Sequence, residues 1–190
     1  YEDIHDLMKR DLWWKEKHYI LNWWANVLLT GDFDGIILKI EMLGKSIDDN
    51  SWLIEVYAWE NRSDFVEWVC SKWYCGIENL VDIPWNVWTA PVSNIWAYWV
   101  EVSSFVKYVE WINLQTWENM IYYHDDCEFA YRTSIFKHRL KEDFLITKVG
   151  FCLPKVTEWY KPNLTYMDVK NKENNLSEEF NGTWACWKDI

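Results

Sequence analysis

The chain has 190 residues, 50% of them hydrophobic, and a formal net charge of −11. This length allows one sizeable domain or two small ones, and the charge argues against sequence-independent binding of nucleic acid or an anionic membrane, which needs clustered Lys and Arg. The sequence has no run of about 18 uncharged apolar residues, no secretory signal and no initiator Met. We therefore expect a cytoplasmic, monomeric fragment of a soluble protein, without nucleic-acid or membrane partners.

The balance of two residue types is abnormal, because 17 Trp stand against only 6 Gly. Glycine ordinarily makes up about 7% of a protein, so roughly half of the expected glycine is absent. The five cysteines have no CxxC spacing and are expected to be reduced thiols. The cluster His124-Asp125-Asp126-Cys127 has metal-ligand residue types but no second cluster to complete a site, and we predict a solvated turn and no metal.

Hydrophobic periodicity predicts a mixture of helices and strands in the first third of the chain. Residues 2–12 are expected to form a helix, and short apolar runs predict strands at 18–21, 27–30, 36–42 and 52–56. Ser63 is expected to cap a helix that runs to Lys72.

The rest of the chain alternates irregular and strand-like segments. Residues 75–99 have no lasting period and contain two prolines, which is typical of a functional loop. Two apolar runs predict a hairpin with Trp117 in its turn, and a further strand and a final helix follow, at 105–114, 118–123, 144–153 and 177–188.

Many tryptophans stand where a chain usually needs a residue without a Cβ. Trp23 and Trp24 follow a predicted strand, Trp117 lies in a predicted turn, and four others punctuate the irregular segment, namely Trp85, Trp88, Trp96 and Trp99. If glycine is read at these positions, residues 20–26 resemble a glycine-rich flavin loop and 78–99 a second flavin segment.

Two further segments need no such substitution. Residues 131–137, Tyr-Arg-Thr-Ser-Ile-Phe-Lys, match the motif Y-R-x-S-x-F-K, and residues 164–168, Leu-Thr-Tyr-Met-Asp, are similar to L-T-Y-G-D. In this order the four segments resemble the bacterial UDP-N-acetylenolpyruvoylglucosamine reductase family over nearly the whole chain. Met167 departs from a family glycine, so the local backbone there is in question.

The resemblance implies an α+β fold with two FAD-binding subdomains of the PCMH type, like that of vanillyl-alcohol oxidase. Residues 1–36 would be the remainder of the first subdomain and 37–190 the second, with the start of the connection to a missing substrate domain. FAD would be held by two groups of residues, the first being Asn22, Trp23, Trp24, Ala25, Asn26 and Val27. The second group is Pro84, Trp85, Thr89, Asn94, Ile95, Trp96, Ala97 and Ile146.

The implied activity is reduction of UDP-N-acetylglucosamine enolpyruvate to UDP-N-acetylmuramate, with FAD as cofactor and NADPH as co-substrate, in peptidoglycan precursor synthesis. Arg132 would be the catalytic residue that stabilises the enolate-like charge, and Tyr131 and Tyr166 would contact the UDP-sugar. The chain stops before the family segment with the proton-donating Ser, so we expect the fragment not to complete the reaction. The alternatives are another flavin oxidoreductase of the same superfamily and a non-enzymatic, aromatic-rich carbohydrate-binding module.

Replacing every tryptophan that stands at a family glycine position would raise the glycine count from 6 to 15. These nine tryptophans are Trp23, Trp24, Trp59, Trp73, Trp85, Trp88, Trp96, Trp99 and Trp117. We hypothesise that the source reads UGA as glycine, as some uncultured bacterial lineages do, and that the sequence was translated with UGA as tryptophan. Trp52, Trp68 and Trp159 fit strand, helix and post-strand positions, and are expected to be genuine.

Overall fold

The computed structural model describes residues 17–21, 28, 30–81, 83–140, 144–157 and 160. The predicted helices at 2–12 and 177–188 lie outside these residues. Of the predicted strand at 27–30 only Leu28 and Thr30 are described, and neither belongs to a strand. No helix in the described part of the chain is long and apolar enough to cross a membrane.

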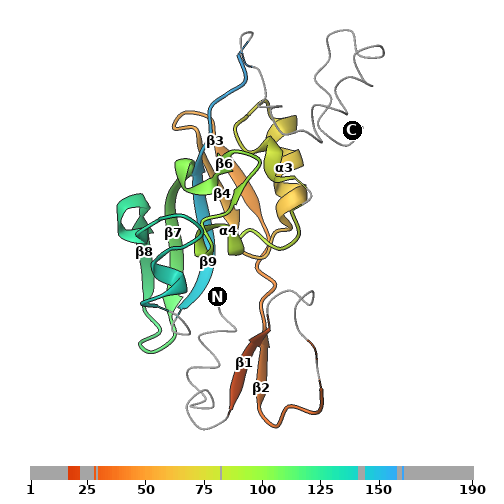
Figure 1. The fold of residues 1–190 in the computed structure, drawn as a ribbon, viewed down its shortest axis with the longest axis vertical. Helices are drawn as coiled ribbons and strands as arrows, with labels where there is room; N and C mark the ends of the chain where they lie inside the picture. The colour runs from red at the N-terminus through yellow and green to blue at the C-terminus, as the bar shows by residue number, and fades with distance from the viewer. Residues whose placement is uncertain are drawn as a thin grey trace.

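A five-stranded antiparallel sheet forms the centre of the fold, in the order β3-β4-β9-β7-β8 (Figure 1). Its strands are β3 (Lys45–Asp48), β4 (Leu53–Tyr57), β7 (Val106–Asn113), β8 (Asn119–Tyr123) and β9 (Phe144–Cys152). The hairpin predicted at 105–123 is confirmed as β7 and β8, and the strand predicted at 144–153 is confirmed as β9.

The middle strand, β9, is buried along most of its length because neighbours flank it on both sides. Gly150 pairs with Tyr108 of β7, and a Cβ at Gly150 would collide with the Tyr108 ring. That ring reaches across the strand, and its hydroxyl donates to Glu55 of β4. Glycine at this position therefore lets one side chain tie three strands together.

One face of the sheet is covered by α3 (Arg62–Ser71), which lies beside β4 in Figure 1. The helix buries Phe65, Val66 and Val69, and the Phe65 ring lies 5.3 Å from that of Phe151 in β9. Its start was predicted wrongly, because the N-cap is Asn61, whose side chain accepts a hydrogen bond from the Asp64 amide at 3.2 Å. Asn and Ser cap helices about equally well, so residue type alone did not distinguish the two positions.

The connections from α3 to β7 and from β8 to β9 consist of short helices, two-residue strands and turns. The segment between α3 and β7 contains η2 (Glu78–Leu80), α4 (Thr89–Val92), β5 (Trp96–Ala97), β6 (Val100–Glu101) and η3 (Val102–Ser104). After β8 come η4 (His124–Cys127) and η5 (Ile135–Lys137). In η4, Asp126 accepts from the Tyr123 amide at 3.0 Å and Cys127 is fully buried, so these residues have structural roles in the turn.

A parallel pair, β1 (His18–Leu21) and β2 (Ile36–Lys39), lies apart from the main sheet in Figure 1. Ile20 and Leu38 of this pair pack against a small apolar cluster that includes Leu145 at one end of the sheet. β2 ends at Lys39, three residues earlier than the strand predicted at 36–42. The subdomain boundary at residue 36 remains a prediction.

Candidate functional site

Backbone hydrogen bonds hold the segment from residue 83 to 101 close to the start of α3. The Arg62 amide donates to the Trp85 carbonyl at 3.2 Å. In the other direction, the Val87 amide donates to the Glu60 carbonyl and the Trp88 amide to the Ala58 carbonyl, both at 3.0 Å. The Asn86 side chain, which is buried, donates to the Trp59 carbonyl at 2.6 Å. These bonds fix the path of the predicted second flavin segment before α4 begins at Thr89.

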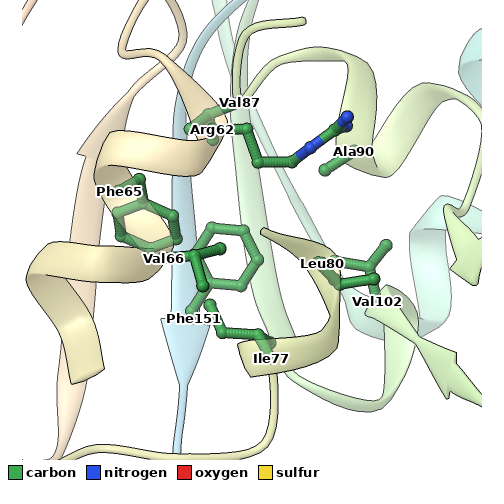
Figure 2. Close-up of a pocket in the computed structure, with 9 residues that line it drawn as sticks. All are labelled: Arg62, Phe65, Val66, Ile77, Leu80, Val87, Ala90, Val102 and Phe151. Carbon is green, nitrogen blue, oxygen red and sulfur yellow. The ribbon is translucent and has the colours of Figure 1, made fainter. Parts of the chain in front are cut away.

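Arg62 supplies a second fastening for the same segment. Its guanidinium donates to the carbonyls of Ile83, at 2.6 Å, and Pro84, and to the hydroxyl of Thr89 at 3.2 Å. Figure 2 shows Arg62 at one end of a small pocket whose other lining residues are apolar, namely Phe65, Val66, Ile77, Leu80, Val87, Ala90, Val102 and Phe151.

The Arg62 side chain is 3% exposed, and no carboxylate among the described residues forms an ion pair with it. Burial lowers the pKa of Arg62 to about 10, so the group remains a cation at neutral pH. Its Nε has no hydrogen-bond partner in the described part of the chain. A buried cation of this kind is stabilised only by the carbonyl and hydroxyl dipoles that it collects.

Asn94 joins the predicted flavin segment to the predicted substrate segment. Its side chain is fully buried, and its Nδ2 donates to Glu101 at 2.6 Å and to the Ala130 carbonyl at 2.9 Å. Its Oδ1 accepts from the Ser103 amide at 3.1 Å. Every hydrogen-bonding group of one short side chain is thus used to hold three backbone regions together.

The motif at residues 131–137 lies next to the predicted flavin segment. The Ser134 hydroxyl donates to the Val92 carbonyl at 2.8 Å, and the Tyr131 ring lies 5.8 Å from that of Trp96, edge to face. Arg132, one residue on, is exposed and has a φ of +52°, and its carbonyl accepts from Lys137 at 3.0 Å. Tyr131 and Arg132 are therefore both at the surface, and Tyr131 contacts Trp96 of β5.

The other predicted cofactor residues take varied positions. Pro84 and Trp85 are at the surface, Thr89 is buried at the start of α4, and Ile95 leads into β5, where Trp96 and Ala97 are half-buried. Ile146 is buried in β9, opposite Trp111, as part of the main core. Residues 22–27 and Tyr166 lie outside the described residues, so their predicted roles stay predictions.

The residues as written do not fit a flavin on this segment. The rings of Trp96 and Trp99 lie 5.7 Å apart, and Trp96 also contacts Tyr131, so aromatic rings fill the junction between the two motif segments. A dinucleotide held by backbone amides needs close approach to the main chain, which a Cβ and an indole prevent. With these tryptophans in place, the segment has no room for FAD against its backbone amides.

Sequence reasoning missed two residues that position this segment, Arg62 and Asn86. Asn61 before Arg62 was a usable signal, because an Asn in front of an apolar helical run predicts an N-cap and places the following residue at the helix start. No feature of the sequence indicates that the Arg62 side chain turns inward.

Two of the relatives that the chain matches among known proteins share one name. The chain is 37% identical to the UDP-N-acetylenolpyruvoylglucosamine reductase of Flavobacterium johnsoniae over 182 residues, which cover 93% of this chain and 53% of the relative. It is 40% identical to the enzyme of that name from Dechloromonas aromatica over 161 residues, or 82% of this chain and 47% of the relative. No family model matches the chain.

The fold agrees with a solved structure of the same name. The crystal structure of UDP-N-acetylenolpyruvylglucosamine reductase from Thermus caldophilus matches with a TM-score of 0.57 at 18% identity, over 91% of this chain and 58% of that one. The mixed α/β architecture is thus shared, and the chain spans about half the length of the curated relatives it matches. These similarities show that the chain belongs to the UDP-N-acetylenolpyruvoylglucosamine reductase family.

Proposed function

We propose that the protein to which this chain belongs reduces UDP-N-acetylglucosamine enolpyruvate to UDP-N-acetylmuramate, with FAD as its cofactor and NADPH as the reductant. The family relationship and the unaltered motif at 131–137 support this proposal. The strongest structural support is the hydrogen bond from the Asn94 side chain to the Ala130 carbonyl. It holds the predicted flavin segment against the residue that precedes Tyr131 and Arg132.

Arg132 is the group of the described chain best placed to act on the substrate. It is exposed and follows Tyr131, whose ring contacts Trp96 of the flavin segment. A guanidinium can bind a carboxylate through two parallel hydrogen bonds. In that position it would bind the substrate carboxylate and stabilise negative charge that develops on the enolpyruvyl group during reduction. Tyr131, a residue that is 70% exposed, would pack against the same substrate.

The test uses the full-length gene product with glycine at the nine family glycine positions. We expect the purified protein to show flavin absorbance and to oxidise NADPH only when UDP-N-acetylglucosamine enolpyruvate is present. Absence of bound flavin, or NADPH oxidation that does not depend on this substrate, would show that the proposed function is wrong.

Arg132→Lys tests the residue assignment within the same protein. Lysine keeps the charge but loses the paired geometry, so kcat should fall by on the order of 100-fold. Arg139→Lys is the matched control, because Arg139 is an exposed arginine whose ion pair with Glu128 lies at the surface. Equal kcat in the two variants would contradict the role of Arg132.

A further inference from the structure

The tryptophans of this chain have an unusual distribution of backbone angles. Ten of the 17 lie in the described residues, and half of those ten have a φ between +57° and +106°. Only a few per cent of non-glycine residues adopt positive φ, and a bulky residue there is an outlier. The five are Trp52, Trp73, Trp85, Trp99 and Trp117.

Trp73 occupies the position after the C-cap of α3, where helices commonly end on a left-handed glycine. Its amide donates to Cys70 at 3.0 Å, and the next amide, that of Tyr74, donates to Val69 at 3.2 Å. This pair of bonds is the Schellman motif, and the buried Tyr74 and Val69 provide its usual apolar contact. Trp73 is 60% exposed, so little packing offsets its strained backbone.

Trp99 lies in a two-residue hairpin loop. Ala97 of β5 pairs with Val100 of β6, which leaves Tyr98 and Trp99 as the loop, with φ of +49° and +65°. Positive φ at both loop residues is characteristic of a type I′ turn, and glycine is the strongly preferred residue at its second position. The tryptophan thus stands where this turn asks for glycine.

Trp52 and Trp117 occupy the same position in two loops of the same kind. Four residues separate Asp48 from its partner Leu53, and four separate Asn113 from Glu118, whose carbonyl accepts from the Asn113 amide at 3.0 Å. The residue before each loop is also an acceptor: the Asp48 side chain accepts from the Asn50 amide at 3.0 Å, and that of Asn113 from the Gln115 amide at 2.8 Å. The last loop residue is the tryptophan, with φ of +57° and +64°.

The equivalence of the two loops corrects the sequence interpretation of Trp52. The strand predicted from Trp52 begins instead at Leu53, and Trp52 belongs to the turn. The backbone geometry of Trp52 is therefore like that of Trp117, a position at which the family resemblance already implies glycine.

Trp85 is the most extreme of the five. Its φ of +106° lies far beyond the left-handed region near about +60° that L-residues can enter. By contrast, Trp68 lies within helix α3 and Trp111 within strand β7, and neither has a positive φ. Trp59 and Trp88 lie in turns but have no positive φ, so only some of the tryptophans in turns have the backbone geometry of glycine.

We propose that residues 52, 73, 85, 99 and 117 are glycine in the protein that the source cell makes, because their codons are UGA read as glycine. The glycine assignment rests on backbone geometry, and the UGA reading rests on the excess of tryptophan over glycine, so neither depends on the proposed enzymatic function. It adds Trp52 to the set and explains why indoles stand on a segment where close backbone approach is required.

The direct test reads the gene and the protein from the source cells. UGA codons and glycine residue masses in the peptides that span the five positions are expected, with UGG and tryptophan at Trp68 as the control. Tryptophan found at any of the five positions would overturn the proposal in this form.

A stability measurement tests the physical argument separately. In the full-length protein with glycine at the other four positions, residue 73 is compared as Gly and as Ala. Alanine removes the indole but keeps the Cβ, so the glycine form should melt about 2 to 4 °C higher. An equal or lower melting temperature for the glycine form would count against a glycine site there. Residue 117 is unsuitable for this comparison, because its indole is buried in a small cluster.

Discussion

The five-stranded sheet and the segment from η2 to η3 are held in place by different forces. Side chains such as Ile54, Val56 and Val149 in the sheet are fully buried and apolar. The segment at 78–104 has little regular structure, and nearly all buried polar side chains of the described chain lie in it or hydrogen-bond to it. Only Thr147 does not; the others are Arg62, Asn79, Asn86, Thr89, Asn94, Ser103 and Ser134.

The two regions differ in how strictly their structure depends on the identity of each side chain. Apolar burial has no direction and tolerates exchange of one apolar residue for another of similar volume. A buried hydrogen bond has one geometry, and its loss leaves a desolvated polar group. The region with the candidate site is therefore the one in which single polar substitutions should do specific damage.

The largest expected effect lies in the sheet. Trp111→Ala removes a fully buried indole that packs against Tyr122 and Phe136, and should lower the free energy of unfolding by about 3 to 5 kcal/mol. Urea denaturation measures this loss. Trp68→Ala on the half-buried part of α3 is the matched control and should lose clearly less; equal losses would contradict the burial difference.

A somewhat smaller loss is expected where the polar segment is fastened. Arg62→Met keeps most of the side-chain volume but leaves the carbonyls of Ile83 and Pro84 without their donor, at a cost of about 2 to 3 kcal/mol. Hydrogen exchange should show faster exchange at the amides of Val87 and Trp88. Arg139→Met, at the surface, should change neither quantity, and unchanged exchange in Arg62→Met would argue against the fastening.

Asn94→Asp probes the junction between the two motif segments. The change replaces an amide donor with a carboxylate that faces Glu101, so repulsion and a lost bond to Ala130 should cost about 1 to 3 kcal/mol. Thermal unfolding at pH 7 measures the loss. Asn50→Asp, in an exposed turn, is the control, and equal melting temperatures for the two variants would contradict the role of Asn94.

The smallest effect is chemical and compares thiols in the core and at the surface. Burial, with a contribution from Asp126, raises the pKa of Cys127 to about 12, so almost no thiolate exists at pH 8. Cys152 is exposed. Iodoacetamide followed by peptide mass analysis should label Cys152 first and leave Cys127 unmodified until the protein unfolds; early labelling of Cys127 would show that η4 opens readily.

Strands with a clear apolar pattern could be predicted, whereas β3 could not. The runs at 105–114 and 144–153 contain enough apolar residues for their burial to be inferred, and both form strands at the centre of the sheet. β3 has a single apolar residue, Ile47, and is an edge strand, so pairing with β4 rather than its own burial makes it a strand. A pairing partner is not visible in a local pattern.

The candidate site was predictable only as a set of segments. The match at 131–137 identified Tyr131 and Arg132, since a short motif is local in sequence. The fastening by Arg62 and the junction at Asn94 join residues up to 36 positions apart, and neither residue type indicates by itself whether it will be buried.

The family, the main strands and the excess of tryptophan over glycine could be inferred from the amino-acid sequence, because each is a matter of local pattern or composition. Which tryptophans have a positive φ became clear only in the folded chain. Trp52 and Trp68 looked equally regular in sequence, yet one lies in a left-handed turn and the other in a helix. The sign of φ depends on the type of turn that joins two strands, and the paired residues that define the turn are known only once the strands have been placed in the sheet.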